Sequence, residues 1–137
     1  MRIALGALVS VAVLLAACGG AGAPAAAATV KTVDDAKLGK ILVSSSGMTL
    51  YTYDKDTENV TNCYDTCATN WPALTLASGT PVADVGVTGK LATTDRKEGT
   101  KQVTWNGKPL YFYAKDKAAG DTAGDNVGTV WHVIKNP

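Results

Sequence analysis

The fold is decided by a stretch of seven residues that occurs twice in the chain, as LYTYDKD at 50–56 and as LYFYAKD at 110–116. A shift of 60 positions aligns the two copies without a gap. The same shift places Trp71 on Trp131, well beyond the stretch itself. Because self-similarity at a fixed spacing indicates a duplication, we expect two tandem copies of one structural unit.

The duplication sets the expected domain boundaries. The match extends upstream to Asp35 on Asp95, so repeat one is expected at about 30–77 and repeat two at about 90–137. A unit of this length cannot bury a core alone. We therefore predict a single duplicated domain over 30–137.

Each repeat carries the sequence pattern of β-strands joined by tight turns. Runs rich in Val, Thr, Tyr and Trp favour strands, and Asn106-Gly107 is a strong signal for a two-residue hairpin turn. The strands expected are 30–35, 40–46, 50–54, 90–96, 101–105, 110–113 and 130–134. Within each repeat the strand before the turn (40–46 or 101–105) is expected to pair with the one after it (50–54 or 110–113). The predicted fold class is thus mostly β: a small antiparallel β domain in which each repeat is a hairpin plus a long loop.

One short helix is expected around 63–70, near a pair of cysteines. Thr61 or Asn62 could cap its first turn, because both side chains can accept backbone N–H bonds there.

The paired tyrosines of each repeat share one face of their strand, because side chains alternate between faces. Two interpretations remain open. The tyrosines can form core with the tryptophans, since a domain with a single Phe needs other large side chains inside; or they can form an aromatic surface for a sugar, a quinone or a protein partner. The candidate binding surface comprises Tyr51, Tyr53, Asp56, Trp71, Tyr111, Tyr113, Asp116 and Trp131.

The acidic residues after these strands are expected to fix turns by accepting backbone N–H bonds. A calcium loop is the alternative, with ligands Asp54, Asp56, Glu58, Asn62 and Asp65. The alternative is weak because such a loop needs Gly at its sixth position and Glu at its twelfth, and this stretch has neither. We predict no cofactor and no resident metal.

The first 17 residues have the pattern of a secretory signal. Arg2 precedes an apolar run of 15 residues, Ile3 to Ala17, which is shorter than the roughly 20 residues that span a bilayer. The run closes on Leu15-Ala16-Ala17-Cys18, which resembles the lipobox of bacterial lipoproteins. The resemblance implies cleavage after residue 17 and a lipid on Cys18; the alternative is an ordinary signal peptide cut further along.

Residues 18–29 contain only Gly, Ala, Pro and Thr after the cysteine. A stretch with no charge and no large side chain is typical of a flexible tether. We expect an extracytoplasmic domain anchored to the bacterial cell membrane by its lipid, with the tether as spacer.

The remaining cysteines, Cys63 and Cys67, have no counterpart in repeat two, where Ala123 and Val127 stand. In an oxidising compartment a structural disulfide is the default expectation. Two alternatives stay open: an exchangeable redox pair, and a metal site of Cys63, Cys67 and His132. The three-residue spacing fits neither the thioredoxin motif nor the c-type haem motif.

Composition excludes several function classes. A formal net charge of +1 with no basic cluster gives no footprint for nucleic acid. His132 is the single histidine, and no nucleophile elbow, phosphate loop or dinucleotide fingerprint accompanies it. We therefore expect no nucleic-acid partner and no enzyme activity.

Three segments together carry a resemblance to a known family: LYTYDKD at 50–56, NCYDTCATNWP at 62–72 and NGKPLYFYAKD at 106–116. They resemble the predicted bacterial lipoproteins with a Tyr-x-(Phe/Trp/Tyr)-x-x-Asp motif, a family also described as a secreted repeat of unknown function. The resemblance covers about 38–134. It implies export and duplication, but no activity.

These observations favour a lipid-anchored binding or scaffolding module whose partner is an unidentified cell-envelope protein or a small ligand. The alternative is a redox-active or metal-handling lipoprotein, of the electron-transfer type, that uses Cys63 and Cys67.

Overall fold

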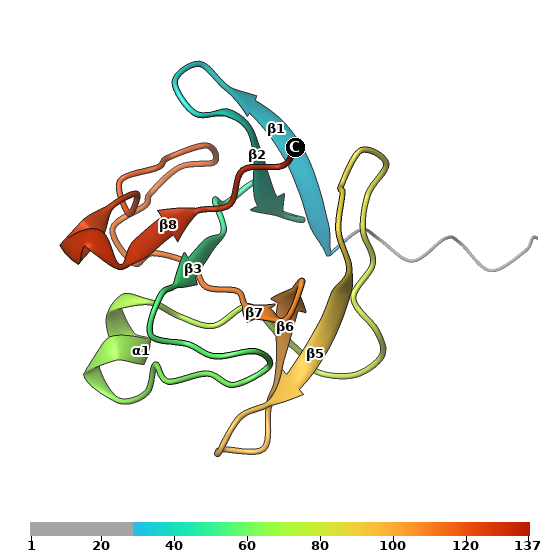
Figure 1. The fold of residues 1–137 in the computed structure, drawn as a ribbon, viewed down its shortest axis with the longest axis vertical. Coiled ribbons are helices and arrows are strands. Elements are labelled where there is room, and N and C mark those ends of the chain that lie inside the picture. Colours follow the sequence, from blue (N-terminus) through green and yellow to red (C-terminus); the bar gives the residue numbers. More distant parts are fainter. Residues whose placement is uncertain (1–28) are drawn as a thin grey trace, which may run out of the picture.

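The computed structural model describes residues 29–137, which contain eight short strands, one α-helix and one 3-10 helix joined by long loops (Figure 1). Their order is β1 (Val30–Asp35), β2 (Gly39–Ser44), β3 (Tyr51–Tyr53), α1 (Thr66–Asn70), β4 (Thr75–Leu76), β5 (Leu91–Asp95), β6 (Lys101–Trp105), β7 (Lys108–Pro109), η1 (Val127–Thr129) and β8 (Trp131–Val133). The expected signal peptide at 1–17, Cys18, and the tether up to residue 28 lie outside the described residues. Over the described part, no helix is both long and apolar enough to cross a membrane.

The strands form three small antiparallel sheets. One is the β1–β2 hairpin, paired from Val30 opposite Ser44 to Asp35 opposite Gly39. The second pairs β3 with β8, and the third has the order β4-β6-β5 with β7 also on β6. The predicted mostly β, antiparallel class with one short helix near the cysteines is confirmed.

The hairpin expected around Asn106-Gly107 forms, but only over β6 and β7. The strand predicted at 110–113 is wrong, because the strand after the turn, β7, ends at Pro109. Leu110 still donates to the carbonyl of Val103 at 2.9 Å, and Tyr111 then leaves β6. The reason is competition for its backbone, because the amide and the carbonyl of Tyr111 are both bonded to another strand.

The hairpin expected between 40–46 and 50–54 also forms only next to its turn. The turn at Gly47 does close, with Ser44 donating to the carbonyl of Met48 at 2.8 Å. Beyond it only the Val43–Thr49 bridge and the bond from Leu50 N to Leu42 O continue the pairing. The longer partner of β2 is β1, with which it pairs along its whole length.

The strand that leaves each expected hairpin pairs with the other repeat. Tyr51 N donates to Tyr111 O at 2.9 Å, and Tyr111 N donates to Tyr51 O at 3.0 Å. This exchange relates the two repeats by an approximate two-fold axis. β3 of repeat one also pairs with β8 of repeat two, and β4 of repeat one with β6 of repeat two, so the repeats are interleaved (Figure 1).

Two buried clusters fill the interior, one on each side of the repeated strands. The first holds the aromatic residues, with Tyr51 and Tyr111 fully buried. The second holds aliphatic residues, among them Leu50 and Leu110. The predicted alternation within the repeated stretch is therefore confirmed in both copies.

The helix α1 is only five residues long, and its N-cap residue is Asp65, which makes no side-chain capping bond. The predicted capping by Thr61 or Asn62 is wrong because both residues precede the helix by several positions. Thr61 instead bonds to the hydroxyl of Tyr111, and Asn62 donates to the carbonyl of Lys55 at 2.7 Å.

Candidate functional site

The tyrosine and aspartate of the repeated stretch are hydrogen-bonded across the repeats, not within one copy. Tyr51 Oη donates to Asp116 Oδ2 at 2.6 Å, and Tyr111 Oη donates to Asp56 Oδ2 at 2.6 Å. We call these the crossed Tyr–Asp pairs. The first tyrosine of each copy is thereby hydrogen-bonded to the aspartate at the end of the other copy.

The remaining polar atoms of the crossed Tyr–Asp pairs are also bonded. The amide of Gly124 donates to Tyr51 Oη at 3.2 Å, and the amide of Ala123 donates to Asp116 Oδ1 at 3.0 Å. Asp56 Oδ1 accepts the amide of Asn62 at 2.7 Å. The prediction that these aspartates accept backbone N–H bonds is confirmed. The second oxygen of each carboxylate accepts the hydrogen bond from the tyrosine of the opposite repeat.

Burial governs the electrostatics of the crossed Tyr–Asp pairs. Loss of solvent raises the pKa of both phenols, Tyr51 and Tyr111, and the neighbouring carboxylates add to the effect. Burial also raises the pKa of Asp56 and Asp116, although the hydrogen bond from each tyrosine opposes the change. Both phenols therefore remain protonated at neutral pH.

Four aromatic rings form a continuous stack next to the crossed Tyr–Asp pairs. The order is Tyr53, Trp131, Trp71, Tyr113, with centroid separations of 4.2, 3.8 and 4.2 Å. The two indoles are nearly parallel, at 3°. In each Tyr–Trp step the tyrosine comes from one repeat and the tryptophan from the other, and the central step joins the two tryptophans. We call these four rings the aromatic stack.

The crossed tyrosines meet the aromatic stack edge-on. Tyr51 lies 5.4 Å from Trp71 at 77°, and Tyr111 lies 5.2 Å from Trp131 at 89°. T-shaped and offset-stacked contacts are the preferred arrangements of aromatic pairs. The six rings thus form one symmetric cluster centred on the approximate two-fold axis.

Most of the candidate binding surface lies inside the molecule. Tyr51, Trp71, Tyr111, Asp116 and Trp131 are buried. The other three members, Tyr53, Asp56 and Tyr113, are half-buried. The eight residues therefore do gather in one place, as core between the repeats.

The cysteines and the histidine have different partners in the structure. Cys63 and Cys67 form a disulfide with their Cα atoms 5.2 Å apart, and Cys63 is fully buried in the aromatic cluster. His132 Nε2 instead lies 2.9 Å from Asp54 Oδ2. Within residues 29–137, no group of three or more His, Cys, Asp or Glu side chains is placed to hold a metal ion.

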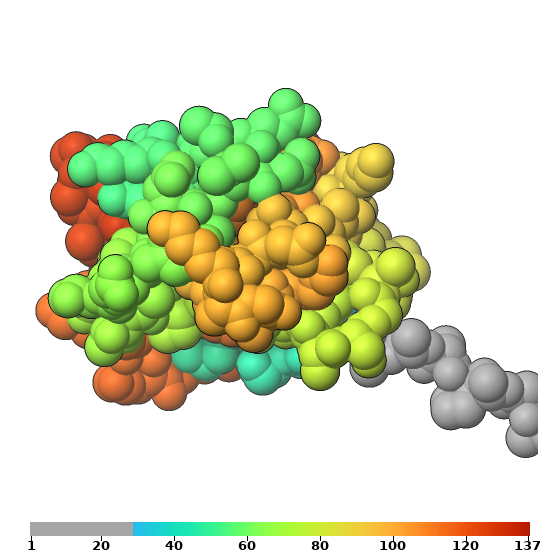
Figure 2. Space-filling view, turned by 90° about the horizontal axis from the view of Figure 1, so that it is seen from below, coloured from blue at the N-terminus to red at the C-terminus, as the bar shows by residue number. Residues whose placement is uncertain are grey.

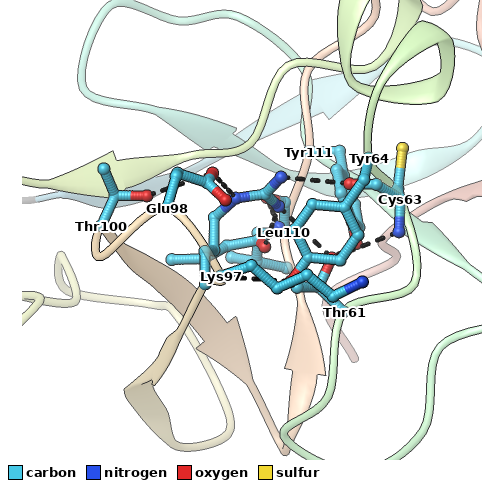
Figure 3. Close-up of polar contacts among 10 residues, drawn as sticks. Thr61, Cys63, Tyr64, Lys97, Glu98, Thr100, Leu110 and Tyr111 are labelled. Carbon is cyan, nitrogen blue, oxygen red and sulfur yellow. Dashed lines mark hydrogen bonds and ion pairs between the residues drawn. The ribbon is translucent and has the colours of Figure 1, made fainter.

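A buried arginine that the sequence reasoning missed lies beside the disulfide. Arg96 is 6% exposed and donates from Nη1 to Gln102 Oε1 at 2.8 Å and to Thr61 Oγ1 at 3.3 Å. Nη2 donates to the carbonyl of Cys63 at 3.1 Å, and Nε pairs with Glu98. Figure 3 shows this network, with Thr61 and Cys63 on one side, Glu98 on the other and Tyr64 between them.

A pocket of about 440 Å³ opens next to this network. Its lining includes Tyr64, whose ring makes cation–π contacts with two side chains. The guanidinium of Arg96 lies 4.6 Å from the ring centroid, and Nζ of Lys97 lies 4.4 Å from it. The remaining lining residues are Asn59, Val60, Thr61, Asn62 and Asp95. In the space-filling view the orange residues of the β5–β6 turn lie against the green loop of repeat one (Figure 2).

The signal that could have found this pocket is asymmetry between the repeats. Under the 60-residue shift, Arg96 falls on Ala36, and Tyr64 falls on Gly124. The disulfide likewise exists in repeat one alone. These single-copy side chains come together at one place, although the sequence separates them by about 30 residues.

A second, smaller hollow of about 320 Å³ is lined by residues of the 52–58 segment and of the turn between β6 and β7. Three carboxylates line it, those of Asp54, Asp56 and Glu58, together with Lys108. Asp56 is held by Tyr111, and Asp54 by His132. The five acidic and amide residues considered above for calcium do not form a metal-holding group within the described residues.

Comparison with known proteins gives one match, which covers most of the chain. A family described as "Secreted repeat of unknown function" matches twice, at residues 32–75 and 92–135. The two matches begin 60 residues apart, as the internal alignment does. Searches of curated proteins and of solved structures gave no match.

Proposed function

Because the chain belongs to this lipoprotein family of secreted repeats, whose description assigns no activity, we propose that it is an extracytoplasmic binding module held at the bacterial membrane by a lipid on Cys18. Its ligand site in this proposal is the pocket between Tyr64, Arg96 and Lys97. The ligand carries a carboxylate group.

The observation that carries the proposal is the division between shared and unshared side chains. The crossed tyrosines and the stacked tryptophans are present in both repeats, and they are buried in the core. Tyr64 and Arg96 occur once, and the corresponding positions hold Gly and Ala. Side chains that the repeat unit does not need for folding are free to serve a ligand, and these border a pocket.

The donors of Arg96 support an anionic ligand. A guanidinium has five N–H groups, and four of them have acceptors among residues 29–137. The fifth, on Nη2, is the donor left for a ligand. Glu98 already binds Nε as an internal carboxylate, and arginine pairs with carboxylates through short, charge-assisted hydrogen bonds.

Two further features favour a carboxylate over a cation. Lys97 adds a positive charge at the pocket, whereas the negative charge of Asp95 is paired with Lys101. Arg96 is also held in place by Thr61, Gln102 and a backbone carbonyl before any ligand arrives, so binding costs little ordering of this side chain.

The test is a nuclear magnetic resonance titration of the ¹⁵N-labelled protein with sodium glucuronate. The controls are glucose, which lacks the carboxylate, and sodium chloride at equal ionic strength. We expect glucuronate alone to shift the amides of residues 61–64 and 95–97, and added salt to weaken the effect.

Variants sharpen this test. Lys97→Ala is expected to weaken glucuronate binding several-fold, whereas Lys115→Ala, which removes an exposed lysine away from the pocket, leaves it unchanged. Equal shifts with glucose, or no loss in Lys97→Ala, would contradict the proposed site.

The proposal assigns binding without catalysis and a structural disulfide. His132, the single histidine, bonds to Asp54, and within residues 29–137 no Ser, Thr or Cys side chain is hydrogen-bonded to it. The redox alternative for Cys63 and Cys67 predicts that replacing both by serine abolishes function. The binding proposal predicts that glucuronate still binds to that variant.

A further inference from the structure

We propose that the aromatic stack and the crossed Tyr–Asp pairs form a one-electron redox site. An outer-sphere one-electron oxidant takes an electron from the stack, and the oxidised state comes to rest as a neutral tyrosyl radical on Tyr51 or Tyr111, with the phenolic proton moved to the partner carboxylate. This activity is independent of the ligand pocket.

The stack provides a continuous path from the surface to the interior. Its two end rings, Tyr53 and Tyr113, are half-buried and reach solvent, whereas the two tryptophans are each 5% exposed. All neighbouring centroids lie within 4.2 Å. Electrons move readily between aromatic rings in such close contact, so an oxidant that touches either end ring can oxidise the inner ones.

The crossed tyrosines are where the oxidised state comes to rest. Tyr51 contacts the edge of Trp71, and Tyr111 the edge of Trp131, so either tyrosine can pass an electron to an oxidised indole. A phenol is oxidised much more easily when its proton can leave at the same time. Each phenol has a proton acceptor at 2.6 Å, which is within the reach that proton transfer requires.

The step balances. One electron leaves the tyrosine and passes through the stack to the oxidant, which is reduced by one electron. The phenolic proton moves from Oη to Oδ2 of the aspartate. The pair changes from a neutral phenol beside a carboxylate to a neutral tyrosyl radical beside a carboxylic acid, so one negative charge disappears from a buried place.

The surroundings favour this outcome. Because a low-dielectric interior disfavours a charged group, removing the carboxylate charge offsets part of the cost of oxidation. Burial raises the pKa of Asp116 and of Asp56, which makes both better proton acceptors. Gly124 N bonds to Tyr51 Oη at 3.2 Å, and this bond can hold the radical oxygen after the proton has moved.

The experiment oxidises the protein with photogenerated tris(bipyridine)ruthenium(III), followed by transient absorption and by electron paramagnetic resonance of rapidly frozen samples. We expect a tyrosyl radical that forms as a tryptophanyl signal decays, because the tyrosine reduces the oxidised indole. The variant with Tyr51→Phe and Tyr111→Phe together is expected to lose the long-lived tyrosyl signal and to retain the tryptophanyl one.

The aspartates are tested by Asp56→Asn and Asp116→Asn, because an amide keeps the shape but cannot take the proton. We expect the combined variant to shorten the lifetime of the tyrosyl radical about tenfold or more. Trp105→Phe is the matched control, since this ring lies outside the aromatic cluster and packs against the aliphatic one, and it is expected to change nothing.

An unchanged tyrosyl signal in the double phenylalanine variant would overturn the proposal, as would a loss of equal size in Trp105→Phe. If a combined variant does not fold, the single variants are compared with the unmodified protein in H₂O and D₂O. Tyrosyl formation coupled to proton transfer is slower in D₂O, and an identical rate in the two solvents would also overturn the proposal.

Discussion

Removing a single hydroxyl group from Tyr51 tests whether the crossed Tyr–Asp pairs hold the two repeats together. The Tyr51→Phe variant keeps the ring and its contacts with Trp71 and Tyr113. It loses the bond to Asp116 at 2.6 Å and the bond from Gly124 N at 3.2 Å. The aspartate then stays buried with one of its protein hydrogen bonds removed.

The expected loss follows from these two bonds. A hydrogen bond to a charged group contributes about 1.5–3 kcal/mol and a neutral one about 0.5–1.5 kcal/mol. Because the second bond is long, we expect the free energy of unfolding to fall by about 3 kcal/mol. For a domain of about 100 residues each kcal/mol changes the Tm by roughly 4–8 °C, so the Tm should fall by roughly 12–24 °C.

The assay is urea unfolding at pH 7, followed by tryptophan fluorescence. The control is Tyr64→Phe, whose hydroxyl has only a 3.4 Å contact with the amide of Lys97, and which is expected to lose less than about 1 kcal/mol. A loss of less than about 1 kcal/mol in Tyr51→Phe, or one no larger than in the control, would refute the reasoning.

Three further predictions concern the same core. Gly124→Ala places a methyl group 2.8 Å from the ring of Tyr51, so thermal unfolding should show a loss of about 1–3 kcal/mol from overpacking. Above pH 10 the stability should fall as pH rises, because the fold raises the pKa of the Tyr51 and Tyr111 phenols and thus binds their protons more tightly than the unfolded chain does. Urea titrations should show that Tyr51→Phe lowers this slope by about 1.4 kcal/mol per pH unit; an unchanged slope would contradict the assignment. Replacing Cys63 and Cys67 together by alanine should cost about 2 kcal/mol, because the loop they close is short, and glucuronate binding should persist.

The fold class could be predicted because it depends on local patterns. Strand alternation placed Tyr51 and Leu50 on opposite faces, and the structure has them in separate buried clusters. The Asn106-Gly107 turn formed as its sequence predicts, because both residues adopt positive φ, 49° and 79°.

The pairing between repeats could not be predicted, because it depends on long-range competition. The hairpin partners expected for 50–54 and 110–113 lie close in sequence, and local reasoning favours them. In the structure the amides of Tyr51 and Tyr111 instead donate to each other's carbonyls. This arrangement buries the aromatic residues of the two repeats against one another. An alignment of the chain with itself shows that two units exist, but not that they interleave.

The candidate site was only partly predictable for a related reason. The sequence indicated the repeated aromatic residues and aspartates, which the structure brings together in the core. Arg96 was missed because a lone arginine in a strand-rich segment looks like a solvated residue. Its burial depends on Gln102 and Thr61, which come from different repeats.

Two double-mutant cycles provide the most direct test of the claim that the repeated stretch joins the two repeats. The first combines Tyr51→Phe with Asp116→Asn, the partners across the repeats. The second combines Tyr51→Phe with Asp56→Asn, which share one copy of the stretch. Coupling energies between contacting residues reach about 0.5–3 kcal/mol, while separate sites are additive within about 0.5 kcal/mol. We predict coupling of about 1.5 kcal/mol or more in the first cycle and additivity in the second; coupling confined to the second cycle would contradict the account.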